Sequence, residues 1–155
     1  MITSEQFFYL NATIITINGV FVGMPSYRQY KLAQQKLKLD LFDRRFKHWD
    51  ALKSLYAAMH NGPNAEAVIS FIGVTWRSDF LFGKDVADHL EKLGKVSLNA
   101  VRLLGEKHNL ARDGQIEKAA TVKKQYDLVM GEFETLYADS IKKFEPYLSF
   151  SKLKH

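Results

Sequence analysis

Apolar residues recur every three or four positions along three long stretches of the chain, which is the spacing of one face of a helix. The clearest stripe lies in residues 28–60, where no proline or glycine interrupts it. Its members are Phe42, Phe46, Trp49, Leu52, Tyr56 and Met59. The pattern predicts a long amphipathic helix over 28–60, ended by Asn61-Gly62-Pro63, because glycine suits a helix C-cap and proline cannot continue the helix.

The next segments predict one short helix and two further long ones. Asn64 is a good N-cap for a short helix over 65–72. Apolar stripes over 84–108 and 115–145 predict two long helices, and Pro146 is expected to stop the second. Short connections favour antiparallel neighbours. The predicted fold class is therefore all-α, with an antiparallel bundle of three long helices and one short one.

Residues 73–83, between the short helix and the next long one, match no single pattern. Trp76 and Phe80 are apolar but stand among charged residues. We expect a turn or a distorted helix packed under the bundle, in which the backbone geometry requires Gly83. Whether the region is a functional surface stays open at this point.

The N-terminal part differs from the rest because residues 6–27 contain no charged residue. The next eleven residues carry four positive charges and no acid: Arg28, Lys31, Lys36 and Lys38. Twenty helical residues span about 30 Å, the thickness of the hydrocarbon core of a bilayer. The layout predicts a single-pass helix in the inner membrane, with the N-terminus outside and the C-terminal domain cytoplasmic. The four cations would then contact anionic lipid headgroups or other phosphates.

A second interpretation of the same stretch stays open. The segment Thr13-Ile14-Ile15-Thr16-Ile17, followed by Asn18-Gly19 and Val20-Phe21-Val22, is typical of a β-hairpin with a type I′ turn. A buried segment of the core is a related alternative. If the stretch is an anchor, Asn11 and Asn18 either contact another transmembrane helix or are merely tolerated. The predicted organisation is an anchor over 1–27, a helical bundle over 28–146 and a tail over 147–155.

Composition and charge narrow the class of protein. The chain has 155 residues, of which 46% are hydrophobic and 25% charged, as expected for one folded domain. Cysteine is absent, which excludes disulfides and thiolate metal sites. The net charge of +5 is concentrated in residues 28–61, where eight Lys or Arg stand against three Asp. Such concentration favours membrane orientation over a nucleic-acid-binding face, along which positive charge would be spread.

No motif with a defined chemistry stands out, and we expect neither an enzyme nor a bound cofactor or metal. The five histidines are scattered. Asp85 and His89, four residues apart, share a helix face, but metal sites usually need three or four ligands. Ordinary surface residues are the preferred interpretation of this pair.

A basic group on the first bundle helix is the candidate interaction surface. Arg44, Arg45 and Lys47, together with Lys36 and Lys38, could contact phosphate in lipid or nucleic acid. Asp40, Asp43 and Asp50 balance part of that charge, which is equally typical of a solvated helix face.

Three blocks of the sequence together resemble a group of small bacterial proteins of unassigned activity. The blocks are KLKLDLFDRRF at 36–46, DFLFGKDV at 79–86 and FEPYLSF at 144–150. The resemblance implies one N-terminal transmembrane helix and a cytoplasmic helical domain, and it carries no site residue.

These observations lead to a membrane-anchored helical module that acts by protein–protein interaction, with a protein partner or further copies of itself. The first alternative is a soluble basic helical module that binds nucleic acid through residues 36–47. The second is an enzyme whose site is assembled from dispersed residues around Asp85 and His89. The sequence does not favour nucleic acid as the partner.

Overall fold

The protein is all-α in its described part. The computed structural model describes the backbone of residues 4–148 and the side chains of residues 27–148. Its helices are α1 (Ser4–Asn61), α2 (Ala65–Thr75), α3 (Asp79–Phe82), α4 (Lys84–Arg112) and α5 (Ile116–Leu148). No strand occurs within these bounds. The chain divides into two compact units, Met1–Asp40 and Leu41–His155.

The first unit consists of the N-terminal part of α1. Its backbone is helical through Asn18-Gly19, so the β-hairpin alternative is wrong. The side chains of residues 1–26, which make up nearly all of the predicted anchor, lie outside the described residues. Within the part of the chain that the structure describes, no helix is long and apolar enough to cross a bilayer.

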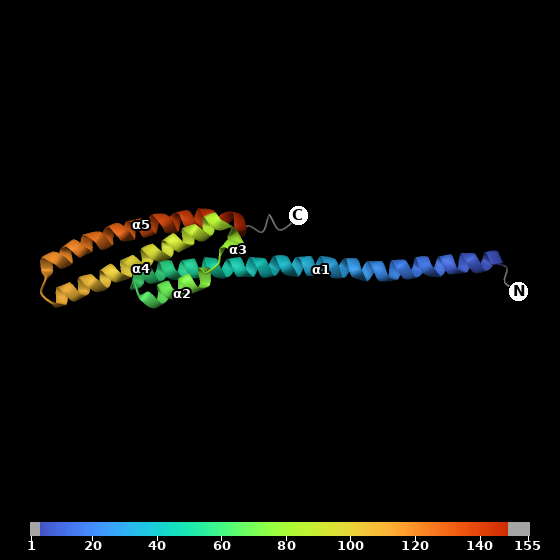
Figure 1. Cartoon of the computed structure of the whole chain (residues 1–155), viewed down its shortest axis with the longest axis horizontal. Coiled ribbons are helices and arrows are strands. Elements are labelled where there is room, and N and C mark those ends of the chain that lie inside the picture. Colours follow the sequence, from blue (N-terminus) through green and yellow to red (C-terminus); the bar gives the residue numbers. More distant parts are fainter. Residues whose placement is uncertain (1–3, 149–155) are drawn as a thin grey trace. The chain divides into compact units, whose positions relative to one another are not determined.

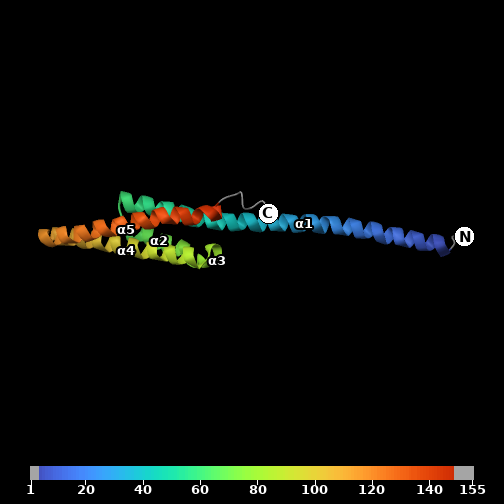
Figure 2. The same ribbon diagram turned by 90° about the horizontal axis from the view of Figure 1, so that it is seen from above.

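The second unit is an antiparallel bundle, as the sequence predicts. Figures 1 and 2 show α4 and α5 side by side, running in opposite directions and joined at Gly114. The C-terminal part of α1 and the short helix α2 complete the bundle. The core residues share helical spacing on each element: Leu52, Leu55 and Met59 of α1, Val68 and Phe71 of α2, Val86, Leu90 and Leu93 of α4, and Phe133, Leu136 and Phe144 of α5.

Aromatic side chains fill the space between α1 and α5. Tyr56 stacks on Tyr137 with ring centroids 4.1 Å apart, and Trp49 lies 5.8 Å from Phe144. Offset and edge-on aromatic pairs contribute about 0.5–1.5 kcal/mol each beyond the area that they bury. Trp49 and Tyr56 of the predicted stripe therefore join α1 to α5.

The predicted end of α1 and start of α2 are confirmed. α1 ends at Asn61, and Gly62 follows with a φ of 152°. The Asn64 side chain accepts a hydrogen bond from the backbone N–H of Ala67 at 2.8 Å, which caps α2. α2 runs to Thr75, three residues further than the predicted end at 72.

The segment before α4 is resolved into a turn and the single-turn helix α3. Gly83 has a φ of 91°, a conformation that residues with a Cβ atom rarely adopt. The expected need for glycine at this position is confirmed. α4 begins directly after it and extends to Arg112, four residues beyond the predicted end.

The predicted stop at Pro146 is wrong, because α5 continues through it to Leu148. Proline removes one backbone hydrogen bond near the end of the helix, but tertiary contacts hold the last turn. The hydroxyl of Tyr147 donates to the carbonyl oxygen of Phe82 at 2.5 Å, and Leu148 packs on the core. Most of the predicted tail lies outside the described residues.

Two glycines of α4 allow a paired test of helix packing. A Cβ atom on Gly94 would lie 3.0 Å from Cγ1 of Ile72 on α2, whereas one on Gly105 would meet nothing within 4 Å. We expect Gly105→Ala to raise the free energy of unfolding by about 0.5–1 kcal/mol. Gly94→Ala should gain less or lose stability, because Ile72 must move. Urea unfolding of both variants measures the difference, and equal gains would contradict the close packing of α2 on α4.

The buried position of His48 predicts that the stability of the second unit depends on pH. Its Nδ1–H donates to the carbonyl oxygen of Arg44 at 2.9 Å, since a carbonyl only accepts. Its Nε2 is buried and has no partner among the described residues, and the ring meets the Phe82 ring edge-on at 5.4 Å. A proton on Nε2 would find no acceptor, and burial lowers the pKa of His48 below its usual value of about 6.5.

We therefore expect the protein to lose stability as the pH falls below about 6.5. Below that pH the unfolded chain binds a proton at His48 that the folded chain still rejects, so the equilibrium shifts toward unfolding. Urea midpoints from pH 7.5 to pH 5 should fall more steeply for the natural protein than for His48→Leu. The exposed His108, replaced by Gln, serves as the control and should leave the slope unchanged; parallel slopes for all three proteins would refute the role of His48.

Candidate functional site

The four basic residues after the uncharged stretch do not converge on one site. Arg28, Lys31 and Lys36 are exposed on α1, and Lys38 is half-buried. Lys31 and Lys38 are seven residues apart and share a face, but Lys36 lies on roughly the opposite side of the helix. The Lys31 ammonium lies 5.1 Å from the centroid of the Tyr27 ring. These cations surround the helix instead of forming a pocket.

The structure gives the predicted surface of Arg44, Arg45 and Lys47 three different environments. Arg45 is engaged within the bundle: its Nε donates to the carbonyl oxygen of Leu81 at 3.0 Å, and its guanidinium lies 5.1 Å from the centroid of the Tyr147 ring. It therefore joins α1 to α3 and α5. Arg44 and Lys47 are exposed. Lys47 borders a hollow of about 380 Å³ between α1 and α2.

Asp85 and His89 are both engaged in contacts with α5. His89 Nε2 lies 3.0 Å from the carbonyl oxygen of Leu136, so this nitrogen carries the proton, and 3.0 Å from the hydroxyl of Ser140. Asp85 forms an ion pair with Lys143 at 3.5 Å. Across the described residues, no group of three or more histidine, aspartate or glutamate side chains could hold a metal ion. The arrangement is typical of contacts that join two helices.

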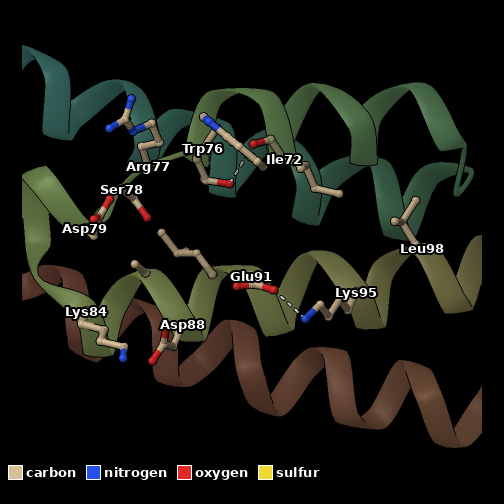
Figure 3. A pocket seen from close by; sticks show the side chains of 13 residues that line it. Ile72, Trp76, Arg77, Ser78, Asp79, Lys84, Asp88, Glu91, Lys95 and Leu98 are labelled. Atoms are coloured by element: carbon tan, nitrogen blue, oxygen red, sulfur yellow. Dashed lines mark hydrogen bonds and ion pairs between the residues drawn. The ribbon is translucent and has the colours of Figure 1, made fainter.

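A groove lies between α2 and α4, as Figure 3 shows. Its volume is about 620 Å³, within the range of about 300–1,000 Å³ for binding pockets. Apolar side chains from both helices and from the residue after α2 line it: Ile72, Trp76, Ala87, Leu90 and Leu98. We name it the α2–α4 groove.

The turn at one end of the groove exposes two aromatic side chains. Residues 76–80, which we name the aromatic turn, comprise the connection after α2 and the first two residues of α3. Trp76 is 74% exposed and Phe80 is 72% exposed, although most other aromatic residues of the bundle are at least half-buried. Exposed aromatic residues beside a groove are typical of sites that bind a partner.

The backbone of the aromatic turn is strained at Arg77. This residue has a φ of 60°, and it is the only non-glycine residue with positive φ in the described part. The amide of Ser78 donates to the carbonyl oxygen of Thr75 at 3.1 Å, which closes the turn. The Arg77 guanidinium lies 4.8 Å from the centroid of the Phe80 ring. Such a conformation costs on the order of 1–3 kcal/mol and is more frequent at functional sites.

Charges around the groove are balanced in sign. Three cations, Arg77, Lys84 and Lys95, and three carboxylates, Asp79, Asp88 and Glu91, border it. Glu91 and Lys95 pair with each other, as Figure 3 shows. Asp79, Lys84 and Asp88 form no ion pair with any described residue. The groove therefore has no net charge to attract a polyanion.

The hydroxyl of Ser78 is directed into the groove (Figure 3). Ser78 is only 2% exposed, yet its hydroxyl makes no hydrogen bond to a described residue. The other buried hydroxyls behave differently: those of Thr75, Ser97 and Ser140 each donate to the carbonyl oxygen four residues before them. Nε2 of His48 is the one fully buried side-chain polar atom without a partner among the described residues. The Ser78 hydroxyl is therefore open to the groove, where water or a ligand can bond to it.

The sequence predicted that residues 73–83 pack under the bundle, and this is wrong for Trp76 and Phe80, which are 74% and 72% exposed. Trp76 and Phe80 belong to none of the predicted apolar stripes. This was the feature of the sequence that could have indicated their exposure. The environment of Ser78 carried no signal, because it depends on where α2 and α4 meet. No protein-family model matches the chain, and searches of curated proteins and of solved structures gave no significant match.

Proposed function

We propose that this protein is a helical module that acts by binding another protein through the α2–α4 groove and the aromatic turn. The observation that carries the proposal is the exposure of Trp76 and Phe80 next to an apolar groove of about 620 Å³. Apolar surface concentrated in this way is stabilised when a partner covers it. The strained backbone at Arg77 gives further support.

Nucleic acid is a less well supported partner. Arg45 of the candidate basic face on α1 contacts Leu81 and Tyr147 within the bundle and is therefore not available to bind phosphate. The α2–α4 groove has equal numbers of cations and carboxylates on its border. A nucleic-acid site would need an excess of cations along one surface.

Membrane attachment is the second part of the proposal. The uncharged residues 6–27, followed by four cations and no acid in the next eleven positions, support an inner-membrane anchor with a cytoplasmic bundle. Fractionation of the full chain beside a version starting at Arg28 tests this. We expect the full chain to pellet with membranes and resist carbonate, and the shorter version to be soluble. A full chain that stays in the supernatant would overturn the anchor and leave the groove proposal intact.

Site-specific photo-crosslinking tests the protein-binding role. The photoreactive residue p-benzoylphenylalanine is placed at Phe80 in one variant and at Leu128 in another, since Leu128 on α5 is equally exposed at 76%. We expect a discrete protein adduct in cells from position 80 and none from position 128. The same adducts from both positions, or none from position 80, would refute docking at the aromatic turn.

A further inference from the structure

We propose that the partner inserts one tyrosine side chain into the α2–α4 groove, where its phenol hydroxyl bonds to the hydroxyl of Ser78. This inference rests on the proposed protein-binding function and names the chemistry of the group recognised. It follows from three features of the groove: one unpartnered hydroxyl, apolar walls and a border of balanced charge.

Ser78 offers a hydrogen-bonding position that the fold itself leaves empty. Its backbone is fully engaged, since its amide donates to Thr75 and its carbonyl oxygen accepts from the amides of Leu81 and Phe82 at 2.9 and 3.0 Å. Only the hydroxyl remains, and it faces the groove (Figure 3). A hydroxyl both donates and accepts, so it can pair with a phenol in either direction.

The apolar walls of the α2–α4 groove favour a ligand group that is apolar apart from the atom that bonds to Ser78. Ile72, Ala87 and Leu90 bring only hydrocarbon to the groove. The hydroxyl of Thr75 is already bonded to the carbonyl oxygen of Phe71 at 2.9 Å. A side chain that fits must combine an apolar ring with one polar atom at its far end. Tyrosine has this form, whereas phenylalanine would leave Ser78 unpaired and a charged group would lose its hydration without a buried counter-ion.

The extent of the apolar surface indicates a polypeptide and not a small molecule. Phe80 and Ile69 are 72% and 62% exposed, and neither lines the groove. A molecule confined to the groove would leave both in water. A tyrosine within a longer segment would let the neighbouring residues cover them, as interface residues around an anchor do.

The charges on the border fit an uncharged anchor flanked by charges of both signs. Lys84 and Asp88 are exposed and form no ion pair with a described residue. Flanking residues of a partner can therefore meet a cation or a carboxylate here. The complementary partner is a segment of mixed charge around a tyrosine, in contrast to a strongly acidic or basic one.

The test uses p-cresol, which is the side chain of tyrosine, and toluene, which lacks the hydroxyl. The full chain is labelled with 5-fluorotryptophan in lipid nanodiscs, and ¹⁹F spectra follow its two tryptophans, Trp76 in the groove and Trp49 in the core. We expect p-cresol to shift the Trp76 signal and not the Trp49 signal. Ser78→Ala should weaken the binding of p-cresol about fivefold, which is the contribution of one neutral hydrogen bond to affinity. The same substitution should leave the binding of toluene unchanged. Ser70→Ala, at an exposed serine of α2, is the control.

Two results would overturn the tyrosine anchor while the proposed function stands. The first is that p-cresol does not shift the Trp76 signal. The second is that Ser78→Ala loses as much affinity for toluene as for p-cresol. In either case, a protein adduct from the photoreactive residue at Phe80 would show that a partner still docks. A third result would overturn both proposals. If the binding of p-cresol depends on Ser78 but the photoreactive residue at Phe80 gives no protein adduct, the groove binds a small aromatic molecule instead.

Discussion

Replacing Phe144 by alanine is expected to lower the free energy of unfolding by about 3–5 kcal/mol, the usual cost of deleting a fully buried aromatic ring. Phe144 is 0% exposed and lies where three helices meet. Its ring is 5.8 Å from that of Trp49 on α1 and 4.8 Å from that of Phe82 on α3. No side chain in this close-packed region can fill the space without moving its neighbours.

Urea unfolding of the full chain measures this effect, with tryptophan fluorescence and circular dichroism as two probes. Ile141, on the same helix and 42% exposed, provides the matched control. Ile141→Ala should cost well under half as much, because much of its side chain is already in water. If the two variants lost equal stability, the core at this end of the bundle would not be packed as described.

Helices α1, α2 and α5 illustrate how much of the fold can be predicted from the sequence. Trp49, Leu52, Tyr56 and Met59 of the predicted stripe lie on the face of α1 that packs in the bundle, whereas Phe46 of the same stripe is 42% exposed. The cap at Asn64 predicted the start of α2. Both depend on local spacing and local hydrogen bonds. Pro146 misled the prediction, because a proline is normally a helix stop and the contacts of Tyr147 with α3 cannot be inferred from neighbouring residues.

The candidate site was less predictable for a related reason. Arg45 stood in the sequence as one of several basic residues on a helix face, and nothing in its neighbours shows that it bonds to Leu81, thirty-six positions away. The environment of Ser78 likewise arises only when the aromatic turn folds over α4. Residues that act through long-range contacts have no periodic signature, so their roles require the arrangement of the helices.

Trp76→Ala is expected to weaken docking of the partner by at least tenfold while leaving the stability of the bundle within about 0.5 kcal/mol. The two effects separate because Trp76 is 74% exposed in the free protein. Its removal costs the fold little packing. A partner would cover it, and a buried tryptophan contributes on the order of 150–250 Å² of contact area. Only part of that gain appears as affinity, since association also costs translational and side-chain freedom.

The yield of the adduct from the photoreactive residue at Phe80 reports the docking, and urea unfolding reports the stability. Leu128→Ala is the matched control, because Leu128 is equally exposed but lies on α5 outside the groove. We expect it to change neither quantity. An unchanged adduct yield in Trp76→Ala would show that the aromatic turn does not contribute to binding. A loss of adduct together with a loss of stability would assign Trp76 a structural role instead, because a docking residue acts only when the partner is present.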